Sequence, residues 1–275
     1  AEKLFTSLKA KGIDFIVHEQ FYSFLKKQNI FSEDISTFSS SNQLSDISYL
    51  FSIGGDGTLL ETVTLIKDSG IPVLGINTGR LGFLTTVTTE SIEETIQAVI
   101  DKNYKIDVRS LLSLEIENNI FGTENYALNE ITLQKKDTSS MITINAYLDG
   151  EYLNSYWADG LIISTPTGST AYSLSCNGPI ILPRSGNIII NPIAPHNLNV
   201  RPLVVPDDME LVFKVEGRTE NFLVALDSRS KSVPLYSELK VKKAPHSLNL
   251  VRLEQYDFLN TLRSKLMWGM DKRNY

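Results

Sequence analysis

Hydrophobic and polar residues alternate in two different ways along this chain, and the change falls near residue 105. Before it, short apolar runs that predict buried strands are followed by segments with apolar residues at helical spacing. The expected strands are 49–53 and 71–76, and the expected helices are 58–66 and 91–100. Strands that alternate with helices are typical of a parallel sheet covered on both faces. We therefore predict an α/β domain with a parallel sheet over residues 1–104.

After residue 105, short β-rich runs follow one another and turn residues separate many of them. The runs are 111–117, 126–134, 141–148, 161–164, 203–205, 211–215, 222–226 and 248–251. This pattern predicts an all-β, sandwich-like domain over residues 105–250. Helical spacing returns at residues 256–267. The C-terminal segment 251–275 is expected to pack back on the N-terminal domain.

Composition narrows the function classes only slightly. The 275 residues are 42% hydrophobic and 21% charged, as in ordinary globular proteins with a sizeable core. A net charge of −6 argues against a nucleic-acid binder, which needs a basic surface. No apolar run is long enough to span a membrane. The lone Cys176 fits a reducing compartment, so we expect a cytoplasmic protein.

The sequence GGDGT at residues 54–58 lies between an expected strand and an expected helix. Its glycines allow close approach of a ligand, and the N–H groups of the helix start suit a phosphate. Asp56 therefore lies inside an anion site, which is unfavourable unless the carboxylate takes part in chemistry or holds a metal. The alternative is that Asp56 only caps the helix or stabilises the turn.

Two common nucleotide motifs do not fit this turn. The chain has no G-x-x-x-x-G-K-[ST] sequence, and Leu60 stands where a G-x-G-x-x-G motif has its third glycine. The turn instead resembles that of the phosphofructokinase-like kinases. That superfamily includes NAD kinases, lipid kinases of the diacylglycerol and sphingosine type, and phosphofructokinases. The turn alone does not choose among them.

A second segment, residues 158–175, reads as a buried strand followed by a loop rich in hydroxyls and glycine. Such a loop offers neutral donors and acceptors for ribose hydroxyls and purine edges. The alternative is a Ser/Thr-rich turn that satisfies its own backbone. The segment closely resembles the NAD kinase signature D-G-[LI]-x-x-S-T-P-[TS]-G-[ST]-T-A-Y. Further matches in the same order lie at residues 77–84, 128–130, 194–196, 201–203, 262–266 and 268–269.

The resemblance to NAD kinases implies ATP-dependent phosphorylation of the adenosine-side ribose 2′-hydroxyl of NAD, giving NADP. It implies that Asp56 is the general base that takes the proton from this hydroxyl. The residues it implies for dinucleotide binding are Asp56, Gly57, Asn129, Glu130, Asp159, Thr170, Ala171, Tyr172, Ser173, Leu174, Ser175 and Ala194. At residues 227–229 the chain reads Asp-Ser-Arg where relatives usually have Asp-Gly-Gln, and no binding role is carried onto it.

The same resemblance implies a divalent cation, Mg²⁺, as cofactor and a homo-oligomer, tetramer or dimer. The three histidines, at positions 18, 196 and 246, are too scattered to indicate a metal site, so no residue is assigned as a metal ligand. Two other functions stay open: a lipid or sugar kinase of the same superfamily, and a dinucleotide sensor without catalysis. The sequence leaves the choice between NAD and NADH, and between ATP and polyphosphate, undecided.

Overall fold

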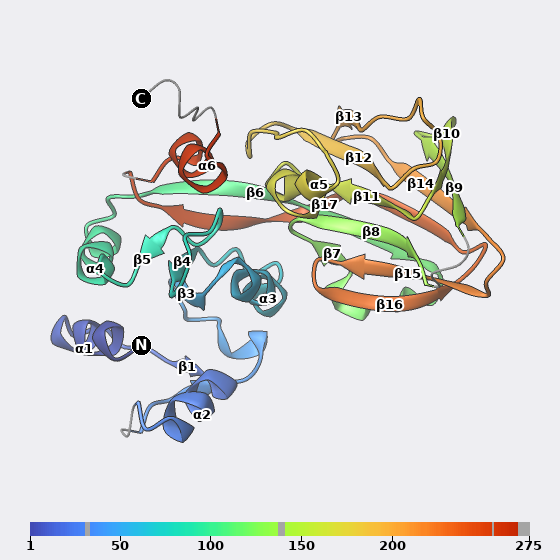
Figure 1. Ribbon diagram of the computed structural model, residues 1–275. Coiled ribbons are helices and arrows are strands. Elements are labelled where there is room, and N and C mark those ends of the chain that lie inside the picture. Colours follow the sequence, from blue (N-terminus) through green and yellow to red (C-terminus); the bar gives the residue numbers. More distant parts are fainter. Residues whose placement is uncertain (31–33, 137–140, 255, 269–275) are drawn as a thin grey trace. The chain divides into compact units, whose positions relative to one another are not determined.

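The computed structural model describes residues 1–30, 34–136, 141–254 and 256–268. The chain forms two compact units (Figure 1). Unit 1 contains Ala1–Asp107 and the C-terminal stretch from Asn249, whereas unit 2 contains Val108–Leu248. The sequence analysis had placed the two boundaries at 104/105 and 250/251. Two strands carry the chain from one unit to the other, β6 (Lys105–Ile116) and β17 (Glu238–Arg252).

Unit 1 is an α/β structure with parallel strands, as the strand–helix alternation predicted. β3 (Leu50–Gly54) pairs in parallel with β4 (Val73–Asn77), which also pairs in parallel with β5 (Val87–Thr88) and with β17 through Leu250. A second, two-stranded sheet joins β1 (Val17–His18) to β2 (Thr37–Phe38). The helices are α1 (Glu2–Ala10), α2 (Glu19–Lys27), α3 (Asp56–Ile66), α4 (Ile92–Ile100), α6 (Phe258–Leu266) and the 3₁₀ turn η1 (Ser41–Gln43).

Unit 2 is built from antiparallel strands, as the run of short β segments predicted. One sheet has the order β13-β12-β11-β8-β15-β16, and β10, β9, β14 and β17 follow one another in a second. The strands are β7 (Tyr126–Ala127), β8 (Glu130–Lys135), β9 (Ile142–Leu148), β10 (Glu151–Ala158), β11 (Gly160–Ser164), β12 (Asn187–Ile193), β13 (Leu203–Pro206), β14 (Leu211–Glu216), β15 (Asn221–Leu226) and β16 (Arg229–Pro234). Short helical turns are η2 (Glu117–Asn119), η3 (Gly122–Glu124), η4 (Thr167–Thr170) and α5 (Tyr172–Ser175).

The core of unit 2 is filled by alternate residues of both sheets. Ile131 and Leu133 of β8 belong to one buried cluster with Leu161 and Ile163 of β11 and with residues of β9, β14 and β17. Because side chains alternate along a strand, Glu130 of β8 points to the opposite face. The α5 turn, which follows β11 and η4 along the chain, lies on that face, because the Tyr172 N–H of α5 bonds to Glu130. The α5 turn is thus placed next to the residues that the sequence assigned to NAD.

Three features of the fold differ from the sequence pattern. Strands β10 and β16 were not expected, since their polar residues interrupt the apolar alternation, and neither was β12, although it contains three consecutive buried isoleucines at 188–190. The expected strand 126–134 is two strands, because the peptide groups of residues 128 and 129 bond to groups outside the sheet ladder. Ser91 is the N-cap residue of α4, but its side chain makes no capping hydrogen bond.

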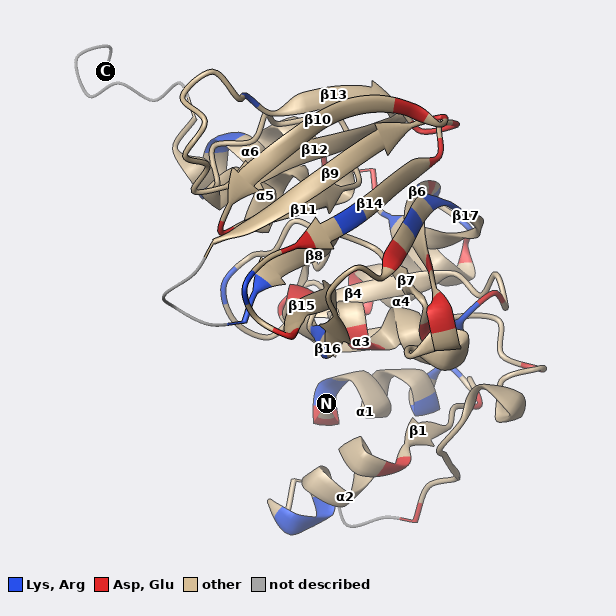
Figure 2. Ribbon diagram, turned by 90° about the vertical axis from the view of Figure 1, so that its right-hand side faces the viewer, with Lys and Arg blue, Asp and Glu red and all other residues tan. Residues whose placement is uncertain are grey.

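Charged residues are spread over both units. Figure 2 shows Asp and Glu segments interspersed with Lys and Arg segments, in keeping with the modest net charge of −6. Among the described residues, no helix combines the length and apolar character that a membrane span requires.

Candidate functional site

In unit 1, Asp56 is the first residue of α3 and its carboxylate fixes a neighbouring loop. Oδ2 accepts the N–H of Phe83 at 2.8 Å, and Oδ1 accepts the N–H groups of Leu84 and Thr85 at 3.1 and 3.0 Å. Oδ1 also accepts the Thr85 hydroxyl at 2.9 Å. The N-cap residue of α3 is Gly55, and no side chain caps this end of the helix. The capping alternative is therefore wrong, and Asp56 instead holds the loop 83–85.

Two glycines make room for this arrangement. A Cβ atom on Gly82 would overlap Oδ1 of Asp56, and one on Gly54 would overlap the Thr58 side chain. The loop that contains Gly82 is held from its other end by Asn77, whose Nδ2 donates to the Arg80 carbonyl at 2.7 Å. The GGDGT turn and the loop that follows β4 therefore form one hydrogen-bonded structure around the Asp56 carboxylate.

A lysine of the C-terminal helix lies next to the same carboxylate. Nζ of Lys265, on α6, is 3.9 Å from Oδ2 of Asp56 and 4.8 Å from the centre of the Phe83 ring. Phe83 also contacts Phe258 of α6, with ring centres 6.1 Å apart. The Lys265 side chain is 35% exposed, so this is a long and partly screened ion pair. It nevertheless leaves a cation beside the carboxylate.

In unit 2, the carboxylate of Asp227 holds the segment that contains Asn129 and Glu130. Its oxygens accept the N–H groups of Leu128, Asn129 and Glu130 at 2.8, 2.8 and 3.2 Å. The Asp227 N–H donates back to the Glu130 carbonyl at 3.0 Å. Asp227 adopts a positive φ of 52°, a conformation that Asp tolerates better than most residues. The backbone between β7 and β8 is therefore fixed by one side chain.

The loop after β11 holds the same segment from its carbonyl side. The Thr165 hydroxyl donates to the Leu128 carbonyl at 2.6 Å, and the Thr165 N–H donates to the Asn129 carbonyl at 2.9 Å. A Cβ on Gly168 would overlap the Asn129 carbonyl oxygen. This close approach explains why the loop has glycine there.

Most hydroxyls of the 164–170 loop bond within the protein. Ser164 and Ser169 donate to backbone carbonyls, and Thr170 donates to the Thr167 carbonyl at 3.3 Å. The Thr167 hydroxyl accepts from Arg109 at 3.2 Å. For these hydroxyls the self-satisfied turn, considered as the alternative in the sequence, describes the structure better than a row of ligand donors.

The α5 turn is anchored to the sheet by Asn191 of β12. Its Nδ2 donates to the Ser173 carbonyl at 2.9 Å, to the Ser173 hydroxyl at 3.2 Å and to the Cys176 carbonyl at 3.3 Å. A Cβ on Gly178 would overlap the Ser173 hydroxyl, so the chain turns closely past this point. Tyr172 is 38% exposed, and its hydroxyl accepts from Gln134 at 3.3 Å. The residues from Thr170 to Ser175 are thus held with one tyrosine ring facing outward.

Asp159 and Ala194 lie side by side where β10 leads into β11 and β12 ends. The Asp159 N–H donates to the Ile193 carbonyl at 3.0 Å, and its carboxylate pairs with Nζ of Lys135 at 2.7 Å. Ala194 is exposed and adopts a positive φ of 44°, which is rare for alanine.

Two acidic side chains share the buried region around residue 130. Burial raises the pKa of Glu130 to about 8, and the negative charge of Asp227 adds to that rise. Burial also raises the pKa of Asp227, against the effect of its three N–H donors and of Arg229. Oε2 of Glu130 is buried and has no hydrogen-bond partner among the described residues. The two acids therefore differ in their hydrogen bonds, because both oxygens of Asp227 accept backbone N–H groups whereas Oε2 of Glu130 accepts none.

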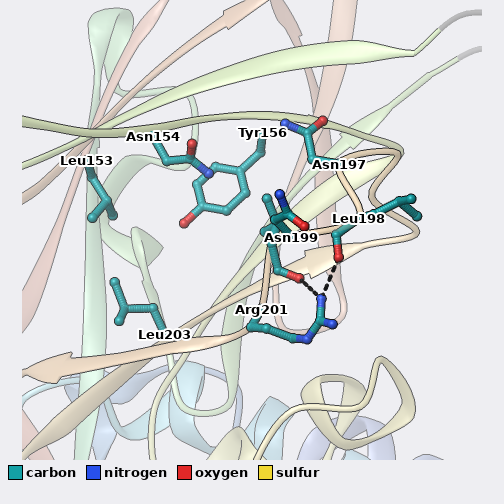
Figure 3. Close-up of a pocket in the computed structure, with 9 residues that line it drawn as sticks. Leu153, Asn154, Tyr156, Asn197, Leu198, Asn199, Arg201 and Leu203 are labelled. Carbon is teal, nitrogen blue, oxygen red and sulfur yellow. Dashed lines mark hydrogen bonds between the residues drawn. The ribbon is translucent and has the colours of Figure 1, made fainter.

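A separate cavity of about 610 Å³ lies elsewhere in unit 2, between β10 and the segment before β13 (Figure 3). Arg201 closes one side by donating to the carbonyls of Leu198 and Val200 at 2.7 and 2.8 Å. None of the residues assigned to NAD in the sequence analysis is among the nine that line it. The cavity is therefore not the candidate site.

The structure places the predicted residues in two groups. Asp56 and Gly57 begin α3 in unit 1, and the other assigned residues belong to unit 2, where Asn129, Glu130 and the 170–175 segment lie together. The sequence analysis assigns no role to Asp227, Asn191 or Lys265. Asp227 stands in a motif that differs from the usual family sequence, and Asn191 lies in β12, a strand that was not expected. Lys265 lies in the matched segment 262–266, which was a signal, as was the position of Asp227 at a turn after an expected β run.

Comparisons with known proteins match two stretches of the chain to one family. Residues 1–104 match the ATP-NAD kinase N-terminal domain, and residues 128–253 match the ATP-NAD kinase C-terminal domain. The NAD kinase of Flavobacterium psychrophilum is 52% identical over 99% of this chain and 94% of its own length. The NAD kinase of Cytophaga hutchinsonii is 50% identical over 97% of this chain and 92% of its own length.

Two solved structures share the fold. Yeast NADH kinase, solved with NADH, superimposes with a TM-score of 0.87 at 24% identity, covering 98% of this chain and 83% of that one. An NAD kinase from Archaeoglobus fulgidus, solved with ATP, gives a TM-score of 0.72 at 26% identity, covering 92% of this chain and 97% of that one. With family matches over both units and relatives of about half identical sequence, the chain belongs to the ATP-NAD kinase family.

Proposed function

We propose that this chain transfers the γ-phosphate of ATP to the 2′-hydroxyl of the adenosine ribose of NAD, giving NADP. Membership of the family supports the enzyme class and both substrates. The observation within the structure that best supports the reaction is the Asp56 carboxylate, held among glycines at a helix start by three backbone N–H groups. Phosphoryl transfer depends mainly on such positioning, with a carboxylate that orients the attacking hydroxyl.

Asp56 is the proposed general base. Its Oδ1 already accepts three hydrogen bonds, whereas Oδ2 accepts one among the described residues. A carboxylate oxygen has two lone pairs, so Oδ2 can accept the ribose hydroxyl and then its proton. The loop 83–85 prevents the carboxylate from rotating away. A positioned base typically contributes about 10²–10⁴-fold to the rate.

The proposed NAD contacts in unit 2 follow from the same assignment. Asn129 and Glu130 contact the dinucleotide from the segment that Asp227 holds. Asp159 binds a ribose hydroxyl while Lys135 keeps its carboxylate in place. Tyr172 supplies a ring surface, and the backbone from Thr170 to Ser175 and at Ala194 borders the ligand. Gly57 is also proposed to lie against the dinucleotide.

The divalent cation is proposed to enter with ATP. Mg²⁺ in kinases is held largely by the substrate phosphates, together with one or two carboxylates. Such binding does not require three protein ligands, and the described residues hold no cluster of three His, Cys, Asp or Glu side chains. When bound, the cation neutralises charge on the phosphates. In this chain, the carboxylate of the GGDGT turn, Asp56, would be available to hold it.

Two further properties are proposed on the family resemblance. The chain forms a homo-oligomer, a tetramer or dimer, which light scattering on the purified protein would measure. It acts in the cytoplasm, which is consistent with the single Cys176.

The central test is NADP formation by the purified protein with Mg²⁺. We expect ATP and NAD to give NADP, and diacylglycerol and fructose 6-phosphate to remain unphosphorylated. Parallel reactions with NADH and with polyphosphate define the acceptor and donor that the sequence left open. If calorimetry shows NAD binding but no donor gives NADP, the chain would be a dinucleotide sensor rather than a kinase. Phosphorylation of the lipid or the sugar instead of NAD would assign the chain to another branch of the superfamily.

A further inference from the structure

Glu130 and Asp227 are two acids that share one buried region with unequal hydrogen bonding. Both carboxylate oxygens of Asp227 accept backbone N–H groups, so this side chain acts only as an acceptor there. Glu130 is 8% exposed, and its Oε2 is buried without a partner among the described residues. A buried ionised oxygen without a donor is costly, whereas a protonated one needs only an acceptor. The described residues offer no such acceptor, which points to one on the ligand.

The groups that face Glu130 come from three elements. Asp227, at the turn between β15 and β16, opposes a second negative charge, and Arg229 acts on Asp227 rather than on Glu130. From α5, the Tyr172 N–H favours the charged form of Glu130, but less than burial and Asp227 oppose it. Tyr172 and Cys176 are the remaining titratable groups on that side, and burial raises the pKa of both, so they are neutral at pH 7.

We propose that Glu130 is held as a neutral acid and donates a hydrogen bond to an acceptor atom of NAD, with Asp227 as the residue that positions it. The inference rests on the proposed function, since the resemblance assigns Glu130 to the dinucleotide. Asp227 has two effects here. It fixes the backbone of residues 128–130, and its charge keeps the neighbouring proton in place. Ionisation of Glu130 would remove the donor and bring a negative charge toward the phosphates of NAD.

The inference predicts a particular pH dependence of NAD binding. Calorimetry measures the dissociation constant from about pH 6.5 to about pH 9, a range that includes the pKa of Glu130, about 8. Affinity is expected to be constant on the acid side and to fall by up to about tenfold per pH unit on the alkaline side. Glu130→Gln carries a permanent donor, so its affinity is expected to stay within a few-fold of wild type at low pH and to lose the alkaline decrease.

Asp227→Asn and Asp149→Asn form a matched pair. Asp149 also has a positive φ and accepts one backbone N–H, from Glu210 at 2.8 Å, in a turn with no assigned NAD contact. Removal of the charge at residue 227 lowers the pKa of Glu130, so affinity is expected to start falling at a lower pH. Asp149→Asn is expected to keep the wild-type profile. If Asp227→Asn does not fold, Glu130→Gln still decides the question, because it leaves the Asp227 hydrogen bonds intact.

The outcomes separate this inference from the proposed function. Two results would overturn the inference in a protein that forms NADP, and neither would contradict the kinase function. One is an NAD affinity that stays constant or rises across pH 8. The other is an alkaline decrease in affinity that is unchanged in Glu130→Gln. If the protein shows the expected pH dependence of NAD affinity but forms no NADP with any donor, the inference about NAD binding would be supported and the proposed kinase function would be wrong.

Discussion

Asp56 in unit 1 and Asp227 in unit 2 perform the same structural task in different surroundings. Each carboxylate accepts the N–H groups of three consecutive residues and so fixes a loop. Asp56 is 29% exposed and has a cation, Lys265, nearby, whereas Asp227 lies in a buried region beside a second acid, Glu130. In our proposals, the Asp56 carboxylate accepts a substrate hydroxyl directly, whereas the Asp227 carboxylate acts through Glu130. On that basis, the same hydrogen-bonding pattern would position a base in one unit and a proton donor in the other.

The largest expected effect comes from Asp56→Asn. The amide keeps the size of the side chain but cannot take a proton, so turnover is expected to fall by about 10²–10⁴-fold. NAD affinity, measured by calorimetry, is expected to change by less than about threefold, because most assigned contacts lie in unit 2. Turnover within tenfold of wild type would show that Asp56 only holds its loop.

Glu130→Gln tests the buried side of the comparison through stability. Because the folded state raises the pKa of Glu130 from 4.5 to about 8, folding favours the protonated acid. The contribution of Glu130 to the free energy of unfolding is fully present below about pH 4.5 and is lost as the pH rises to about 8. Glutamine does not titrate, so the variant is expected to gain on the order of 2–4 kcal/mol relative to wild type between pH 5 and 8.5. Urea unfolding at both pH values measures this difference.

Two glycine substitutions, one in each unit, are expected to affect different kinetic constants. Gly82→Ala pushes against Oδ1 of Asp56, and Gly168→Ala pushes against the Asn129 carbonyl. We expect the first to lower kcat by about 10–100-fold with little change in KM for NAD, and the second mainly to raise that KM by about tenfold.

Gly79→Ala and Gly217→Ala are the matched controls, since an added Cβ meets nothing within 4 Å at residue 79 and nothing closer than 3.4 Å at residue 217. If kcat and KM change equally in both test variants while the controls stay normal, turnover and NAD binding would not be assigned to separate units.

The smallest expected effect is at Lys265. Its long, partly screened contact with Asp56 predicts a decrease of about 3–10-fold in kcat/KM for Lys265→Gln, with recovery in Lys265→Arg. Arg263→Gln, on the same helix and bonded to Asn260, is the control and is expected to be unchanged. A decrease of the same size in the control would point to α6 packing rather than to the ammonium group.

The sequence predicted the parallel sheet of unit 1 and the sandwich-like unit 2, because apolar periodicity reports burial directly. It missed β10 and β16, whose outward residues are polar enough to obscure the alternation. The GGDGT turn pointed to Asp56 because a carboxylate among glycines is unusual. No such contrast surrounds Asp227, whose partners are backbone groups almost 100 residues earlier in the chain. Pairing over that separation depends on the register of β8 and β15, which no local pattern specifies.

The path of the chain has a consequence for biosynthesis. Unit 2 is one uninterrupted stretch, whereas unit 1 needs the residues from Asn249 onward. During synthesis, all residues of unit 2 are therefore available before the end of β17 and helix α6, which complete unit 1, have been made. This order is unusual, because domains generally fold in N-terminal order. β4 must wait for Leu250 as its partner, and Asp56 must wait for Lys265. A nascent chain stopped before residue 249 would thus carry a foldable binding unit and an unfinished catalytic one, so phosphoryl transfer would be the last property that the growing protein acquires.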